Sequence, residues 1–128
     1  MNILLDTQIA LWALTDSPRL PDRARALIQD VDNTIYFSAA SVWEISIKHQ
    51  LARGDMPVSG EEAAKLFRDA GYLELPITAH HAATTAKLPL RHADPFDRML
   101  VAQALDEPLR LLTHDRKLQT YDESIIFV

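Results

Sequence analysis

Residues 2–7 read NILLDT, an apolar run that ends in the carboxylate of Asp6. A short strand whose central residues are all apolar is typical of a parallel sheet, because helices cover both faces of such a sheet. Three further acids follow strand-like runs at points where a helix is expected to begin. They are Glu44 (after residues 35–38), Asp97 (in residues 94–98) and Asp115 (after residues 109–113). We therefore expect an α/β fold in which these four acids mark the carboxyl ends of parallel strands.

Helical and strand-like segments alternate along the whole chain. The expected strands are residues 3–5, 34–37, 72–75, 109–113 and 125–127. The expected helices are residues 8–13, 21–31, 41–52, 61–70 and 79–87, and one from Asp94-Pro95 to Leu105. In the second helix, Ala24, Leu27, Ile28 and Val31 form one apolar face, and Gly54 and Gly71 are placed to end the third and fourth helices. Alternation of this kind predicts a short parallel β-sheet flanked by helices, a three-layer α/β sandwich.

The bulk composition is that of an ordinary globular protein. The chain has 128 residues, of which 48% are hydrophobic and 24% charged, and we expect one domain over residues 1–128. It contains no cysteine, which excludes a disulfide framework and a thiolate metal site. We find no signal peptide and no long apolar run, so a cytoplasmic location without membrane contact is expected. The net charge of −5 leaves two interpretations open: either the substrate is not nucleic acid, or bound cations and a local basic patch attract it.

The four acids predict a metal site. Carboxyl ends of parallel strands share one edge of the sheet, so Asp6, Glu44, Asp97 and Asp115 are expected to meet there. Two like charges about 4 Å apart repel each other by about 4 kcal/mol at an effective dielectric near 20, and a cation relieves this repulsion. Ligation by carboxylate oxygens alone favours Mg²⁺ or Mn²⁺, and the absence of a His-x₃-His pair argues against zinc. This combination indicates metal-dependent phosphoryl transfer.

Each acid also has a structural interpretation. Asp6 and Asp115 can cap the helices that follow them, and Glu44 stands three residues after Ser41, the spacing of a capping box. Asp97 lies in the first turn of its helix, where a carboxylate favours the helix dipole. Ser, Thr or Asn would cap equally well, so four acids at such junctions favour metal binding. Asp94 is different, because an Asp before proline is the expected N-cap of that helix.

Neighbouring polar and aromatic residues have paired interpretations too. Thr7 and Thr113 either support a ligating carboxylate by hydrogen bonding or are simple turn residues. Three basic residues near the acids, Arg98, Arg116 and Lys117, either hold substrate phosphates or form exposed ion pairs. His92 and His114 either touch substrate or are solvated. The large aromatic residues Trp12, Trp43 and Phe96 invite a role in base stacking, but we expect them to be core residues.

Four segments taken together resemble a known family. They are residues 4–7 (LLDT), 41–44 (SVWE), 94–104 (DPFDRMLVAQA) and 112–115 (LTHD). In this order they resemble the motifs of the PIN-domain ribonucleases and, more narrowly, of the VapC toxins of type II toxin–antitoxin systems. The match extends over essentially the whole chain, and residues 94–104 are its most specific part. At His114 the chain departs from many family members, which carry a small residue there.

The resemblance implies a PIN-like sandwich with Asp6, Glu44, Asp97 and Asp115 around one or two Mg²⁺ or Mn²⁺ ions. Asp6 and Asp97 are expected closest to the metal, while Glu44 and Asp115 orient waters or hold a second ion. The implied activity is that of an endoribonuclease toxin, which hydrolyses RNA phosphodiester bonds with water activated by the metal. The implied partners are an RNA substrate, a second copy in a homodimer, and a small antitoxin that blocks the site. We expect this antitoxin to place an Arg or Lys near Asp6 and Asp97.

Other classes of protein also gather acids around Mg²⁺. A receiver-type signalling domain has a similar length, but it needs an Asp at the end of its third strand, where this chain has Leu75-Pro76, and a Lys at the end of its last strand. A haloacid-dehalogenase-like phosphatase needs a second Asp where Gln8 stands. A PIN nuclease that is not a toxin, and a non-catalytic domain with the same fold, remain as further alternatives.

Overall fold

A five-stranded parallel sheet forms the centre of the molecule. In the computed structural model, which describes residues 1–52, 55–91 and 94–128, the strand order is β3-β2-β1-β4-β5 and every neighbouring pair is parallel. The strands are β1 (Asn2–Leu5), β2 (Thr34–Ser38), β3 (Leu73–Leu75), β4 (Arg110–Thr113) and β5 (Ile126–Phe127). The helices are α1 (Thr7–Leu14), α2 (Asp22–Gln29), α3 (Ala39–Gln50), α4 (Gly60–Asp69), α5 (Ala79–Thr85), α6 (Pro95–Asp106) and α7 (Arg116–Gln119).

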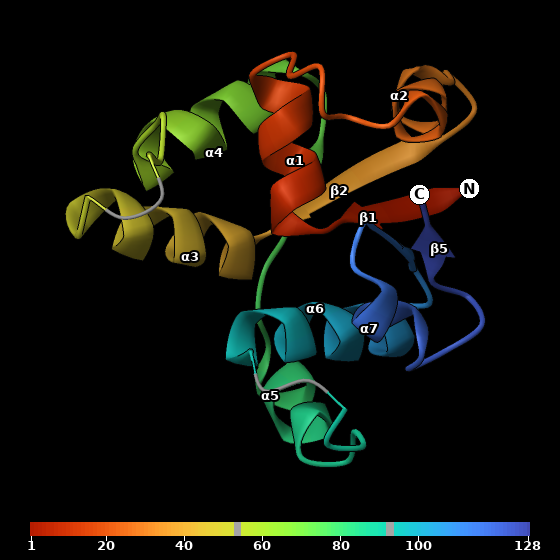
Figure 1. Ribbon diagram of the computed structural model, residues 1–128. Coiled ribbons are helices and arrows are strands. Elements are labelled where there is room, and N and C mark those ends of the chain that lie inside the picture. The colour runs from red at the N-terminus through yellow and green to blue at the C-terminus, as the bar shows by residue number, and fades with distance from the viewer. Residues whose placement is uncertain (53–54, 92–93) are drawn as a thin grey trace.

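The helices form layers on both faces of the sheet, with α1, α2 and α4 on one side and α5, α6 and α7 on the other (Figure 1). Successive side chains of a strand point to opposite faces, and β1 follows this rule. Ile3 and Leu5 pack in a core cluster with residues of α1, α2 and α4, whereas Leu4 packs in a second cluster with residues of α6 and α7. The expected three-layer α/β sandwich is confirmed. In the described part of the chain, no helix has both the length and the apolar character needed to cross a membrane.

Helix α6 lies deep and carries Asp97 in its first turn. The carboxylate of Asp94 accepts hydrogen bonds from the backbone N–H groups of Phe96 (2.8 Å) and Asp97 (3.2 Å), so the expected N-cap is confirmed. Residues 100–104 are all buried, and the helix packs against α5, α3 and β4. A helix that is apolar on most of its circumference is stable only when surrounded by protein. Burial of α6 therefore places Asp97 at the edge of the sheet.

Two glycines permit backbone arrangements that other residues would disturb. Gly71 follows the end of α4 with a positive φ of 88°, the left-handed conformation that ends many helices, as expected. At Gly60, an added Cβ would lie 1.7 Å from the Ser46 hydroxyl oxygen and 3.0 Å from the Val42 carbonyl oxygen. Glycine at this position therefore lets α4 begin in close contact with α3. Gly54, which was expected to end α3, lies outside the described residues.

Two expectations about apolar residues are wrong. Val31 was placed on the buried face of α2, but α2 ends at Gln29 and Val31 is 95% exposed. The Asn33 side-chain amide donates to the Leu27 carbonyl oxygen (2.9 Å), which satisfies the end of the helix two residues before Val31. Trp43 was expected in the core but is 60% exposed on α3, where its ring meets Phe96 edge-on at 5.2 Å.

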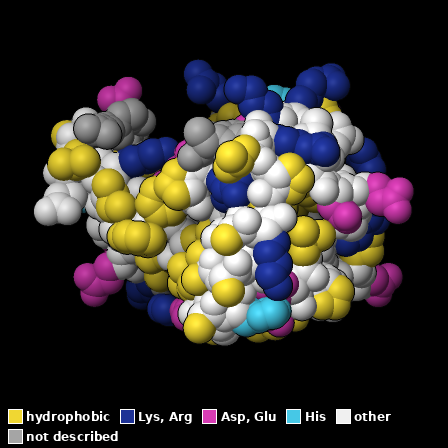
Figure 2. All heavy atoms as spheres, turned by 90° about the horizontal axis from the view of Figure 1, so that it is seen from below, with side chains coloured by type: hydrophobic (Ala, Val, Ile, Leu, Met, Phe, Trp, Pro, Cys, Tyr) yellow, Lys and Arg dark blue, Asp and Glu magenta, His cyan; other side chains and the backbone are white. Residues whose placement is uncertain are grey.

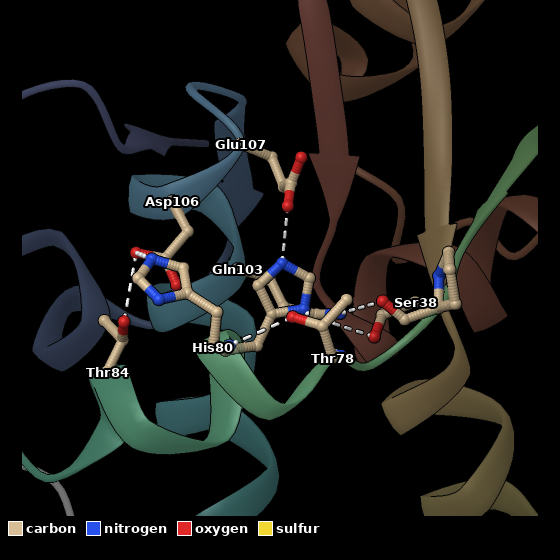
Figure 3. Close-up of polar contacts among 9 residues, drawn as sticks. Ser38, Thr78, His80, Thr84, Gln103, Asp106 and Glu107 are labelled. Carbon is tan, nitrogen blue, oxygen red and sulfur yellow. Dashed lines mark hydrogen bonds and ion pairs between the residues drawn. The ribbon is translucent and has the colours of Figure 1, made fainter.

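Buried polar contacts join β2, α6 and the segment that follows β3 (Figure 3). The Ser38 hydroxyl at the end of β2 donates to the Gln103 side-chain oxygen on α6 (2.5 Å), and the Gln103 amide donates to the Pro76 carbonyl oxygen (3.3 Å). Ser38 and Gln103 are both fully buried. Hydrogen bonds between buried groups fix relative position, because an alternative arrangement leaves polar atoms unsatisfied. Gln103 thus sets how α6 lies against the ends of two strands.

Candidate active site

Six carboxylates line one cleft of about 730 Å³. They come from the turn after β1 (Asp6), from α3 (Glu44), from the segment between α3 and α4 (Asp55), from the start of α6 (Asp94 and Asp97) and from the turn after β4 (Asp115). β1 and β4 are adjacent parallel strands, with Leu5 opposite Leu112, so the residues that follow them emerge side by side. The topology therefore gathers all four acids singled out in the sequence, together with Asp94.

Asp6 is buried and is held by a residue from the neighbouring strand. Its carboxylate accepts a hydrogen bond from the Thr113 hydroxyl (2.7 Å) and makes no side-chain capping bond to α1, so its interpretation as a helix cap is wrong. Burial and the nearby charges of Glu44 and Asp115 raise the pKa of Asp6 to about 6, against the lowering effect of the Thr113 hydrogen bond. The support expected from Thr113 is present. The Thr7 hydroxyl instead hydrogen-bonds the Ser41 hydroxyl (2.7 Å).

Glu44 is buried in the wall of the cleft. The proposed capping box with Ser41 is wrong because α3 begins earlier, at Ala39, where the Ser38 hydroxyl accepts from the backbone N–H of Ala40 (2.9 Å). One carboxylate oxygen of Glu44 accepts from the Lys48 ammonium at 2.7 Å. The other, Oε1, is buried without a hydrogen-bond partner among the described residues. Buried polar atoms in native proteins nearly always have a partner, so this oxygen is suited to receive a ligand.

Asp97 shows how strongly the acids affect one another. Partial burial, followed by the charges of Asp6, Asp94, Glu44 and Asp115, raises the pKa of Asp97 to about 8. Loss of solvation is the larger cause of this rise, and the like charges nearby add to it. A carboxyl group that is neutral near pH 7 is unusual and is typical of functional sites.

Asp115 both caps a helix and lines the cleft. Its carboxylate accepts from the backbone N–H of Lys117 (2.9 Å) at the start of α7, so the capping interpretation is correct for this residue. Its own backbone N–H donates to the Thr113 hydroxyl oxygen (3.0 Å). The Thr113 hydroxyl therefore bridges the Asp115 backbone and the Asp6 carboxylate.

The cationic residues of the cleft are not those expected from the sequence. Its lining contains Lys48 and Arg19. Arg98 instead donates to the carbonyl oxygens of Thr85 (2.7 Å) and Pro89 (2.9 Å), and the Arg116 guanidinium lies 4.6 Å from the centre of the Phe127 ring. The sequence did contain a signal for Lys48: it follows Glu44 by four residues on one helix, and residues at this spacing are neighbours. For Arg19 we see no comparable signal.

Aromatic rings form another part of the wall. Trp12 and His114 line the cleft, and their rings meet at 65° with centres 5.5 Å apart. The His114 ring also stacks on the Phe127 ring, with ring centres 5.7 Å apart and an angle of 8° between the ring planes. Its Nδ1–H donates to the Val128 carbonyl oxygen (2.5 Å). Trp12 is half-buried rather than a full core residue. His92, the other histidine considered for substrate contact, lies outside the described residues.

The chemistry of these residues fits a hard divalent cation. The candidate ligands are carboxylate oxygens, which Mg²⁺ and Mn²⁺ prefer, and Glu44 Oε1 is a buried acceptor without a described partner. Within the residues that the structure describes, no three His, Asp or Glu side chains are grouped closely enough to hold an ion as they stand. Binding would therefore require side chains around the cleft to turn toward one another, which relief of their repulsion favours.

Comparison with known proteins identifies the class. A family model described as the PIN domain matches residues 3–124, and the chain therefore belongs to the PIN-domain family. The receiver-type alternative is excluded by this result. Within the family, the chain is 31% identical over 125 residues to ribonuclease VapC22 of Mycobacterium tuberculosis, a match that covers 94% of this chain and 92% of that protein. The chain is thus a relative of the VapC ribonucleases, as its motifs indicated.

Solved structures agree with the fold. VapBC2 of Rickettsia felis, solved with a DNA fragment from its promoter, has a chain that matches with a TM-score of 0.71 and 16% identity, covering 100% of this chain and 98% of that one. FitAcB of Neisseria gonorrhoeae matches with a TM-score of 0.62 and 21% identity, covering 98% and 96%. At this level of identity the likeness concerns the fold alone.

Proposed function

We propose that this VapC relative is the toxin of a toxin–antitoxin pair and hydrolyses RNA phosphodiester bonds with the help of Mg²⁺ or Mn²⁺. The observation that carries the proposal is the single cleft lined by Asp6, Glu44, Asp97 and Asp115. Burial, and after it the repulsion from neighbouring acids, raises the pKa of Asp6 and Asp97, so the ionised carboxylates are costly there unless a cation is bound. The family membership supplies the reaction class.

The proposed roles follow from the contacts of each residue. Asp6 and Asp97 would hold the cation, and Thr113 fixes the orientation of the Asp6 carboxylate through its 2.7 Å hydrogen bond. Glu44 and Asp115 would orient water or hold a second ion. When bound, the cation supplies charge compensation and polarises water and phosphate. Lys48, which is paired with Glu44, and Arg19 are outnumbered by the acids that line the cleft, so the bound cation would supply the main attraction for phosphate.

The proposed partners are an RNA, an antitoxin and a second copy of this chain. Solved relatives described as VapBC2 and FitAcB are the basis for expecting a protein antitoxin that covers the cleft. For the homodimer we propose the apolar surface around Trp43 and Ile77, which are 60% and 37% exposed. Figure 2 shows hydrophobic side chains across the left and central parts of one face, with Lys and Arg along its upper margin. We expect the protein to act in the cytoplasm.

The test is cleavage of purified total RNA by the isolated chain, free of antitoxin. Discrete fragments should appear with Mg²⁺ or Mn²⁺ and disappear with EDTA, while duplex DNA should remain largely intact. A suitable control is Asp22→Asn, the same chemical change on α2 outside the cleft, which should cleave as the wild type does. Fragmentation that persists in EDTA would contradict the metal mechanism. Activity without growth inhibition on expression would instead indicate a PIN nuclease that is not a toxin.

A further inference from the structure

The aromatic wall of the cleft, formed by Trp12 and His114, has no role in metal binding. His114 directly precedes Asp115, and Trp12 lies on α1, the helix that begins after Asp6. Both rings line the same cleft as the acids. A substrate whose phosphate reaches Asp6 and Asp115 therefore has aromatic rings within reach of an adjoining group.

Contacts with the C-terminal residues Phe127 and Val128 hold the His114 ring of this wall in place. The His114 ring is fixed by its hydrogen bond to the Val128 carbonyl oxygen (2.5 Å) and by parallel stacking on Phe127 at 5.7 Å. The Arg116 guanidinium lies over the Phe127 ring at 4.6 Å, so the rings and the cation form a layered stack. A surface already held in one conformation loses little conformational entropy when a ligand binds.

The other groups of the cleft define the kind of ligand. Arg19 lines it together with the acids, so it offers a cationic side chain beside the aromatic surface, whereas Lys48 is paired with Glu44. Every nucleobase has an apolar face that stacks on aromatic side chains without regard to sequence. In a duplex these faces are covered by neighbouring bases, whereas an unpaired base is free to stack.

We infer that Trp12 and His114 form a nucleobase subsite, in which an unpaired base next to the scissile phosphate stacks on these two rings. This inference rests on the proposed function and adds to it the two residues that contact the base. Loss of one stacking ring should weaken binding of single-stranded RNA by about 10-fold.

Binding is tested in an Asp97→Asn background, so that RNA is not cut, with Trp43→Phe added. The chain has two tryptophans, so Trp12 is then the only one. A single-stranded 12-nucleotide RNA should quench Trp12 fluorescence, and the same RNA in a duplex should not. His114→Ala should weaken binding about 10-fold, His114→Phe should restore it because the ring still stacks on Phe127, and His80→Ala, a histidine outside the cleft, should bind normally. Melting curves confirm that each variant is folded.

Cleavage by the otherwise wild-type protein separates this inference from the proposed function. If the wild type cleaves RNA but His114→Ala and Trp12→Leu leave binding and cleavage sites unchanged, the subsite is wrong and the nuclease stands. If the wild type cleaves no RNA with either metal, the proposed function itself fails. Equal quenching by single-stranded and duplex RNA would also overturn the inference, as would quenching by a basic peptide but not by RNA.

Discussion

At the scale of single residues, the carboxyl group of Asp97 depends strongly on its surroundings. Partial burial and the charges of Asp6, Asp94, Glu44 and Asp115 raise its pKa to about 8. An isolated carboxyl of this kind would be fully ionised at neutral pH. The acids of the folded protein therefore repel one another in the cleft. This repulsion makes Asp97 a candidate ligand for a cation, and it lowers the stability of the metal-free protein.

Asp97→Asn and Asp6→Asn should abolish metal-dependent cleavage, with a loss of at least about 100-fold, because an amide is a poorer ligand for a hard cation. The shape of the side chain is kept. Saturating Mg²⁺ should stabilise the wild type by about 2.7 kcal/mol at a hundredfold excess over Kd, and either variant much less. RNA cleavage and melting temperature, each with and without Mg²⁺, are the measurements. A variant that cleaves RNA or responds to Mg²⁺ as the wild type does would remove that residue from the site.

The raised pKa values predict how the metal-free protein responds to pH. An unfolded carboxyl titrates near 3.8, whereas folding raises the pKa of Asp6 to about 6 and that of Asp97 to about 8. The folded state therefore binds these protons more tightly, and the associated stability is present in acid and lost as pH rises through about 6 and about 8.

The prediction is checked in EDTA by melting curves of the wild type and Asp97→Asn between pH 5 and pH 8. The melting temperature of the variant minus that of the wild type should grow with pH, by at least about 3 °C over this range. Titrating groups outside the cleft are common to both proteins, so their effects cancel in the difference. A difference that stays constant, or shrinks toward pH 8, would show that Asp97 is ionised like an ordinary carboxyl.

At the scale of elements, the contact between β2 and α6 decides where Asp97 stands. It depends on the buried hydrogen bond of 2.5 Å from Ser38 to Gln103, which lies six residues after Asp97 on the same helix. Helix α6 is otherwise held by apolar side chains, which resist separation but have no strong directional preference. The polar contact therefore contributes the specific orientation.

Gln103→Leu should destabilise the protein by about 1–3 kcal/mol, since it leaves a buried Ser38 hydroxyl without its acceptor. Adding Ser38→Ala should recover part of this loss, so that a double-mutant cycle gives a coupling energy of about 0.5–3 kcal/mol. Urea unfolding of the four proteins gives the free energies. Strict additivity of the two single changes would show that the hydrogen bond does not join the two elements energetically.

At the scale of the whole molecule, an acidic cleft should select a cationic inhibitor. The cleft is lined by six carboxylates, and complementary charge speeds association and selects partners. We expect the neighbouring gene to encode a small antitoxin with a basic tail that is disordered until it binds. One of its Arg or Lys side chains should come to lie near Asp6 and Asp97.

This prediction is checked by measuring inhibition of RNA cleavage by the antitoxin at increasing salt. Inhibition should weaken as salt rises, and replacing every Arg and Lys of the tail by Gln should remove it. Replacing the same number of acidic or polar residues in the antitoxin provides the control. Inhibition that is insensitive to both salt and the loss of all basic tail residues would place the blocking contact elsewhere.

The sequence alone determined the layered parallel fold and which acids follow its strands. These features are local: an apolar run followed by an acid, as in residues 2–7, predicts a buried strand and its end whatever the rest of the chain does. The cap at Asp94 and the left-handed Gly71 are local for the same reason, and both were predicted correctly. Family motifs added the class of protein, because they extend over most of the chain.

Tertiary structure decided everything that depends on contacts between distant residues. The sequence paired Glu44 with Ser41, but α3 begins at Ala39, and Glu44 instead meets Lys48. It assigned Trp43 to the core although α3 leaves that ring exposed. Arg19 enters the cleft, and the pKa of Asp97 rises to about 8, because the fold brings together elements far apart in the chain. Burial and electrostatic coupling depend on all the neighbours of a residue in three dimensions, so they cannot be predicted from residue spacing along the chain.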